Sequence, residues 1–146
     1  MNSAGESNTA VPYVSIVDDD ESVREAISNL LRSVGLTTEV FASAEAFLRS
    51  ERLKNTTCLI LDVRMPGMNG FELQELLGAA KYRIPIIFIT AHANDLEARN
   101  RALRAGAIDF LCKPFSEEIL LKDVYAAISL LDTTEFADTP RRNAAP

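Results

Sequence analysis

Residues 58–70 read CLILDVRMPGMNG. The apolar residues 58–61 run without a break into Asp62. Such a run, closed by turn residues, is typical of a strand covered on both faces, as in a parallel sheet between two layers of helices. The proline, glycines and asparagine that follow favour a turn. The stretch therefore predicts a central parallel strand that ends on an acidic residue.

The same pattern continues on both sides of this stretch. Strand-type runs are predicted at 13–17, 37–41, 58–61, 85–90 and 107–112. After each run comes a segment of helical character, at about 23–34, 46–48, 73–80, 95–105 and 120–131. Five strand–helix units joined by right-handed crossovers give a three-layer, doubly wound (βα)5 α/β domain. We expect a parallel sheet with the flavodoxin-like strand order 2-1-3-4-5.

The composition bounds the class of protein. The chain has 146 residues, 47% hydrophobic and 25% charged, which excludes a disordered polyelectrolyte. Its net charge of −6 argues against direct binding of nucleic acid, and no stretch resembles a membrane helix or a secretory signal. We expect a cytoplasmic protein with reduced core thiols at Cys58 and Cys112. A folded domain at 11–132 is expected between flexible tails at 1–10 and 133–146, the second of which is either a free end or a linker stub.

The residues that end the predicted strands are the candidates for function, because ligands of open parallel sheets bind beyond the carboxyl ends of the strands. These residues are Asp18, Asp19, Asp62, Thr90 and Lys113. Carboxylates brought close together repel one another, and a hard divalent cation such as Mg²⁺ relieves the repulsion. A carboxylate beside such a cation can attack a phosphoryl group, whose oxygens a lysine and a hydroxyl then neutralise. The set therefore indicates a phosphoryl-transfer site, and the chain has no glycine-rich phosphate loop for a nucleotide.

Four short motifs carry a resemblance to a known family. Residues 16–20 (IVDDD), 61–70 (LDVRMPGMNG), 89–91 (ITA) and 113–115 (KPF) resemble the receiver domain of two-component response regulators. The resemblance spans about residues 11–131, and each motif follows its expected strand in order. The stretch DVRMP and the pair Asp109-Phe110 before Lys113 are similar to the FixJ-like group of receivers.

The resemblance implies roles for the residues around the acidic cluster. Asp62 corresponds to the phosphoacceptor. Asp18 and Asp19 correspond to the metal-binding pair, with Asp19 the more direct ligand, and the backbone carbonyl of Arg64 to the third protein ligand. The expected cofactor is Mg²⁺, with Mn²⁺ as a substitute. We also hypothesise that the side chains of Arg64 and His92, which border the phosphoryl group, set its lifetime; the alternative is that both are solvated loop residues.

The resemblance also implies a switch. Lys113 is expected to pair with Asp62 before transfer and with the phosphoryl group afterwards, and the Lys113–Pro114 bond is expected to be cis. Thr90 corresponds to the hydroxyl that follows the phosphoryl group. Phe110 corresponds to the second switch residue, which turns inward on activation; a plain core role for this ring is the alternative.

The expected function is that of a bacterial signalling switch rather than a metabolic enzyme. A sensor histidine kinase or a histidine phosphotransfer protein would donate the phosphoryl group. The chain would catalyse its own Mg²⁺-dependent transfer and autodephosphorylation. The output surface would be the fourth helix, fifth strand and fifth helix, and the resemblance leaves a homodimer open. No membrane partner is expected.

Two other classes remain open at this stage. One is a phosphatase with an aspartyl nucleophile, which would place an Asp-x-Asp pattern at residues 18–20 but would leave Asp62 without a role. The other is a phosphorylation-independent interaction module of the same fold, against which the complete set of site residues argues. A third question is whether the chain is a stand-alone receiver or the first part of a longer regulator with a DNA-binding domain.

Overall fold

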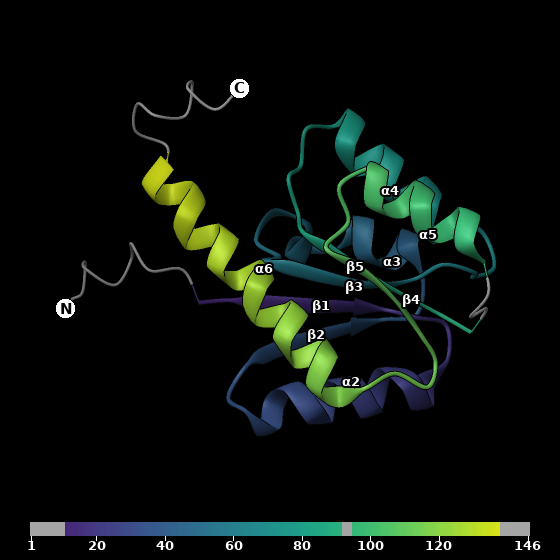
Figure 1. Ribbon diagram of the computed structural model, residues 1–146, viewed down its shortest axis with the longest axis horizontal. Coiled ribbons are helices and arrows are strands. Elements are labelled where there is room, and N and C mark those ends of the chain that lie inside the picture. Colours follow the sequence, from purple (N-terminus) through teal and green to yellow (C-terminus); the bar gives the residue numbers. More distant parts are fainter. Residues whose placement is uncertain (1–10, 92–94, 138–146) are drawn as a thin grey trace.

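The computed structural model describes residues 11–91 and 95–137. Five parallel strands form one sheet in the order β2-β1-β3-β4-β5, which confirms the predicted order. The strands are β1 (Tyr13–Val17), β2 (Thr37–Phe41), β3 (Cys58–Asp62), β4 (Ile86–Thr90) and β5 (Asp109–Cys112). The helices are α2 (Glu21–Ser33), α3 (Ala44–Arg49), the short 3-10 helix η1 (Glu51–Lys54), α4 (Gly70–Ala79), α5 (Leu96–Arg104) and α6 (Glu117–Ala137). The helices lie on both sides of the sheet (Figure 1).

The strand sequences explain the three layers. β3 and β4 are buried at every residue, as unbroken apolar runs require. Their alternate side chains pack into two cores. One core joins the sheet to α3, α4 and α5 through Phe47, Leu73 and Ala102, and the other joins it to α2 and α6 through Ile27, Leu31 and Val124.

The helices begin where the sequence supplies caps. Asp20 accepts a hydrogen bond from the Ser22 amide at the start of α2, as an N-cap residue does, and Ser43 and Ser116 cap α3 and α6. Asn69 and Glu72 form a reciprocal capping box at the start of α4. These caps fix where the chain turns from strand to helix, which is also where the candidate site lies.

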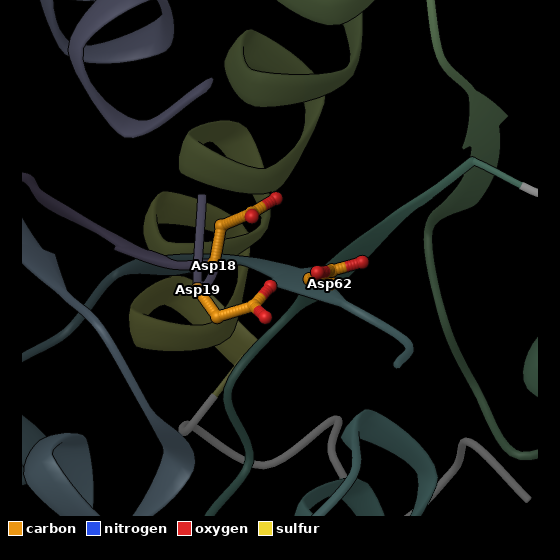
Figure 2. Close-up of side chains that lie close together, drawn as sticks. All are labelled: Asp18, Asp19 and Asp62. Carbon is orange, nitrogen blue, oxygen red and sulfur yellow. The ribbon is translucent and has the colours of Figure 1, made fainter. Parts of the chain in front are cut away.

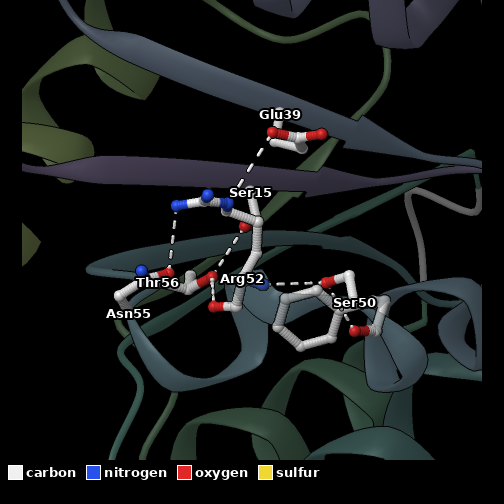
Figure 3. Close-up of polar contacts among 7 residues, drawn as sticks. Ser15, Glu39, Ser50, Arg52, Asn55 and Thr56 are labelled. Atoms are coloured by element: carbon white, nitrogen blue, oxygen red, sulfur yellow. Dashed lines mark hydrogen bonds and ion pairs between the residues drawn. The ribbon is translucent and has the colours of Figure 1, made fainter.

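A polar network ties η1 to β1 and β2 (Figure 3). The hydroxyls of Ser15 and Thr56 lie 2.7 Å apart in the interior, and Thr56 donates to the Arg52 carbonyl. The Arg52 side chain reaches Glu39 at 3.7 Å and Asn55 at 3.2 Å. These contacts give the buried Ser15 hydroxyl of β1 a hydrogen-bond partner. The network, as described, contains a single carboxylate, that of Glu39, and so does not resemble the cluster of carboxylates at the strand ends.

Two features of the fold differ from the sequence prediction. The 3-10 helix η1 is an additional element, and α6 continues to Ala137, beyond the predicted domain end at 132. No disulfide joins Cys58 and Cys112, and burial raises the pKa of the Cys58 thiol to about 12. Among the described residues, no helix is long and apolar enough to cross a membrane.

Candidate functional site

Three carboxylates meet at the carboxyl ends of β1 and β3. Oxygen atoms of Asp18, Asp19 and Asp62 all lie within 4.8 Å of one another (Figure 2). The pairing of Val17 with Leu61 in neighbouring strands sets this arrangement, because the next residue of each strand is an aspartate. Asp18 is fully buried and Asp62 is 4% exposed, whereas Asp19 is exposed. The cluster therefore has a buried floor and one side open to solvent.

The backbone around Asp18 is held on several sides. Its amide donates to the Phe41 carbonyl at 3.1 Å, and its own carbonyl accepts from Arg24 Nη1 at 2.7 Å. The Asp20 amide donates to Asp18 Oδ1 at 2.8 Å. Asp18 Oδ2 is buried and accepts no hydrogen bond from the described residues. One carboxylate oxygen of Asp18 is thus held by the backbone, and the other is left to pair with a cation.

Lys113 is the cation of the site. Its Nζ lies 3.0 Å from Asp18 Oδ2 and 3.8 Å from Asp62 Oδ1. The Lys113–Pro114 bond is cis, as expected. The Lys113 amide donates to the Thr90 carbonyl at 2.7 Å, which places the lysine beyond the end of β5. The ammonium thus lies within ion-pair distance of Asp62, the partner that the resemblance implies, and closer still to Asp18.

The surroundings of Asp62 shift the pKa of its carboxyl group. Burial, and next the negative charge of Asp18, raise the pKa of Asp62 to about 7. A hydrogen bond and the charge of Asp19 act in the same direction, and Lys113 opposes them. The carboxyl group is therefore only partly ionised near neutral pH. A further positive charge in the cluster would favour its ionised form.

The donor set fits a hard divalent cation. Each of the three aspartates offers a carboxylate oxygen, and oxygen ligands suit Mg²⁺ or Mn²⁺. The buried Asp18 Oδ2, which lacks a hydrogen bond within the described part of the chain, is an acceptor that a cation would satisfy. Arg64 lies two residues beyond Asp62, at the start of the loop between β3 and α4, with its side chain exposed. Its carbonyl stays a predicted ligand.

The two predicted switch residues lie on neighbouring strands. Thr90 ends β4 and is 2% exposed. Phe110 on β5 is 4% exposed, and its ring centre lies 6.0 Å from that of Phe88. Phe88 in turn lies 5.2 Å from Phe71 of α4. The Phe110 ring therefore occupies an inward position within an aromatic row, so the core role weighed for it in the sequence is observed.

Arg99 and Asp109 hold the backbone of Phe110. The Phe110 amide donates to Asp109 Oδ1 at 2.8 Å, and its carbonyl accepts from Arg99 Nη1 at 3.0 Å. Asp109 also forms a hydrogen bond with Asp123 of α6, and burial together with this neighbour raises the pKa of Asp123 to about 7. Neither this role of Arg99 nor the contact between Asp109 and Asp123 was predicted from the sequence.

Two further residues shape the site and were missed in the sequence. Glu45 of α3 accepts a hydrogen bond from the Met68 amide, in the loop after Asp62. Gly70 begins α4 so close to β3 that a Cβ there would collide with the Asp62 carbonyl oxygen. The sequence showed Gly70 as a turn residue but gave no sign of the contact. His92, a predicted modulator of phosphoryl lifetime, lies outside the described residues.

Comparison with known proteins gives one consistent result. The family model described as the response regulator receiver domain matches residues 14–125. The response regulator protein TodT of Pseudomonas putida is 49% identical over 115 residues, which are 79% of this chain and 50% of TodT. The transcriptional regulatory protein FixJ of Rhizobium meliloti is 38% identical over 122 residues, which are 84% of this chain and 59% of FixJ. The chain thus spans about half the length of TodT and about three fifths of that of FixJ.

Solved structures agree with the sequence relatives. The structure of the response regulator StyR superimposes with a TM-score of 0.82 at 48% identity, over 92% of this chain and 67% of that chain. The crystal structure named FixJ-N superimposes with a TM-score of 0.72 at 38% identity, over 81% of this chain and 94% of that chain.

Proposed function

The chain belongs to the response regulator receiver family, and on that premise we propose that Asp62 accepts a phosphoryl group from a phosphohistidine. The donor would be a sensor histidine kinase or a histidine phosphotransfer protein of a two-component system. The observation that carries the proposal is the position of Asp62: a buried carboxylate that lies among Asp18, Asp19 and the Lys113 ammonium. These are the groups that a carboxylate nucleophile and its incoming phosphoryl group need.

The transfer forms a bond between an Asp62 carboxylate oxygen and phosphorus, and the bond from phosphorus to the histidine nitrogen breaks. Asp62 must be ionised to attack. Because its pKa is raised, the transfer requires a group that favours the ionised carboxylate at neutral pH. Asp18, Asp19 and the Arg64 carbonyl would hold Mg²⁺, which supplies positive charge to the carboxylates and to the phosphoryl oxygens when it is bound. Lys113, 3.8 Å from Asp62 Oδ1, is placed to pair with a phosphoryl oxygen.

The switching step follows from the neighbouring strands. The Thr90 hydroxyl would donate to a phosphoryl oxygen on Asp62, and the Lys113 ammonium would shift its ion pair from Asp18 towards the same group. Because the Lys113 amide is bonded to the Thr90 carbonyl, movements at the ends of β4 and β5 are coupled. The buried Phe110 lies on β5. Movement of β5 would therefore alter the surface formed by α5, β5 and α6, to which a downstream protein or a second copy of the chain would bind.

The experiment that tests the phosphoacceptor is Asp62→Asn. Wild-type protein incubated with Mg²⁺ and a small phosphodonor is expected to gain one phosphoryl group, seen as a mass increase that hydroxylamine removes, as an acyl phosphate requires. Asp62→Asn is expected to gain none. Asp20→Asn is the matched control, because asparagine also caps a helix and Asp20 is exposed and is not one of the three clustered aspartates. Labelling of Asp62→Asn equal to that of the control would contradict the proposal.

We further propose that Arg64 and His92 set the lifetime of the phosphoryl group by screening or positioning the attacking water. The exposed Arg64 side chain, two residues from Asp62, supports its part of the proposal. Decay of the labelled protein would be followed in Arg64→Ala and His92→Ala. An unchanged rate in both variants would leave these residues as ordinary loop positions.

A further inference from the structure

We propose that Glu45 is a positioning residue of the metal site, because its carboxylate fixes the loop that carries the Arg64 carbonyl. The proposal rests on the function proposed above and adds to it a residue outside the acidic cluster. Glu45 Oε2 accepts a hydrogen bond of 2.9 Å from the Met68 amide, between residues 23 positions apart in the chain. Glu45 belongs to α3, whereas Met68 belongs to the loop between β3 and α4.

The loop is shaped to receive this carboxylate. Gly67, just before Met68, has φ +80, a conformation that favours glycine. A Cβ at Gly67 would stand 2.8 Å from Glu45 Oε2, so the residue also provides the space for the contact. At the base of the loop, the Gly70 amide donates to the Val63 carbonyl at 2.8 Å. The base is thus closed by the loop itself, while Glu45 ties its far side to another element.

The helix that carries Glu45 is also tied to Asp18. The ring of Phe47 in α3 packs edge-on against Phe41 at 5.4 Å, and the Phe41 carbonyl accepts the Asp18 amide at 3.1 Å. α3 therefore contacts both parts of the predicted metal site: the end of β1 through Phe41, and the β3–α4 loop through Glu45. A shift of the loop relative to α3 would change the distance between the Arg64 carbonyl and the acidic pair.

The contact is charge-assisted. Hydrogen bonds from the Met68 amide and from its own backbone amide hold the pKa of Glu45 below its usual value, so the group is ionised at neutral pH. The Glu45 carboxylate does not belong to the acidic cluster, which consists of three aspartates. Its position in the first turn of α3 could also stabilise that helix alone. A test must therefore separate an effect on the metal site from an effect on α3.

The test measures Mg²⁺ affinity by calorimetry in the full chain, without any phosphodonor. Glu45→Ala is expected to bind Mg²⁺ about three- to tenfold more weakly than wild type, since it loses a charge-assisted hydrogen bond. Glu45→Gln keeps an acceptor for the Met68 amide and is expected to remain within about twofold of wild type. Glu51→Ala, which removes a carboxylate from the adjoining η1, is the control for general charge and is expected to match wild type.

A second readout follows the loop directly. Amide hydrogen exchange of residues 63–69 is expected to rise in Glu45→Ala and to stay unchanged in Glu51→Ala. Gly67→Ala perturbs the same contact from the loop side and is expected to weaken Mg²⁺ binding similarly, which keeps the test decisive if Glu45→Ala does not fold.

The outcomes separate the two proposals. Wild-type affinity in Glu45→Ala and Gly67→Ala would overturn the positioning role alone. Equal weakening in Glu45→Gln and Glu45→Ala, with amide exchange of residues 63–69 unchanged in both, would also overturn it, because the lost negative charge and not a change in the loop would then be responsible. Absence of Mg²⁺ binding by wild type would overturn the metal site of the proposed function, and the role of Glu45 with it.

Discussion

The Lys113 ammonium is bound most closely by Asp18, at 3.0 Å, and the proposed phosphoacceptor Asp62 lies farther away, at 3.8 Å. Asp18 is fully buried, and the ion pair balances a carboxylate that water does not reach. A metal cation in the acidic cluster would balance the Asp18 charge in place of the lysine. The Lys113 ammonium could then form an ion pair with the phosphoryl group on Asp62. The ion pair therefore places lysine and metal in partial competition for Asp18.

Lys113→Met tests this competition. Without metal, the variant leaves the buried Asp18 charge unpaired, and we expect a loss of about 2 kcal/mol in the free energy of unfolding, discounted for the partial exposure of the lysine. Mg²⁺ is expected to recover most of the loss. Urea unfolding in EDTA and in Mg²⁺ provides the measurement. Lys54→Met, at an exposed position of η1, is expected to change little in either buffer. Equal losses for Lys113→Met with and without Mg²⁺ would exclude the competition.

Gly70 and Gly78 form a matched pair within α4. A Cβ at Gly70 would collide with the Asp62 carbonyl and approach the Phe88 ring at 3.1 Å, whereas nothing lies within 4 Å of a Cβ at Gly78. We expect Gly70→Ala to lower the free energy of unfolding by about 2 kcal/mol and to reduce labelling of Asp62. Gly78→Ala is expected to raise it by about 0.5 kcal/mol through helix propensity. Similar urea midpoints for the two variants would show that α4 can move away from β3.

The carboxyl pair of Asp109 and Asp123 gives a prediction for pH dependence. The pKa of Asp123 is raised from 3.8 to about 7, because of burial first and then Asp109. The folded state therefore holds a proton that the unfolded state releases, so this group makes stability fall as pH rises from about 4 to 7. The other groups around the pair are Arg99, Lys122 and Cys58.

Asp123→Asn removes this titration and keeps a donor for Asp109. We expect its free energy of unfolding to fall less than that of wild type between pH 4 and 7, by about 1 kcal/mol after allowance for partial exposure. Urea unfolding across this range without Mg²⁺ provides the comparison. Asp62 contributes a fall in the same direction, and that contribution is common to both proteins. Parallel curves for wild type and variant would rule out the shared proton.

Phe88→Leu tests the aromatic row beside Phe110. Phe88 is fully buried between Phe71 and Phe110, and leucine would leave part of its volume empty. We expect a loss of about 1–2 kcal/mol in the free energy of unfolding and faster amide exchange in β5. Phe115→Leu, at a half-buried position on the opposite face, is expected to cost less and to leave β5 exchange unchanged. Exchange in β5 that is the same in both variants would show that Phe88 does not hold Phe110.

The strands and the acidic cluster were predictable from local signals, and the strand order was expected from the doubly wound fold that these signals indicate. Buried runs that end in Asp62 and Thr90 define strands in a parallel sheet, and parallel strands bring their carboxyl ends to one edge. The cluster of Asp18, Asp19 and Asp62 then needs only the register of β1 against β3. The family resemblance supplied the cis bond before Pro114.

The contacts that the sequence did not reveal depend on packing across long intervals of the chain. Nothing near Glu45 marks Met68 as its partner, and nothing near Lys113 ranks Asp18 above Asp62. The inward position of Phe110 follows from the volumes of Phe71 and Phe88, which lie on separate elements. Periodicity assigns a side chain to a face, but it does not say which atoms meet there.

β5 is an outer strand of the sheet, and exposed outer strands invite the addition of further strands and aggregation. Within β5, side chains rather than a neighbouring strand bind the amide and the carbonyl of Phe110. Asp109 and Arg99 already occupy both groups. A docking strand could pair with these two backbone groups only after both side chains had moved, so Asp109 and Arg99 hinder strand addition and self-association at Phe110.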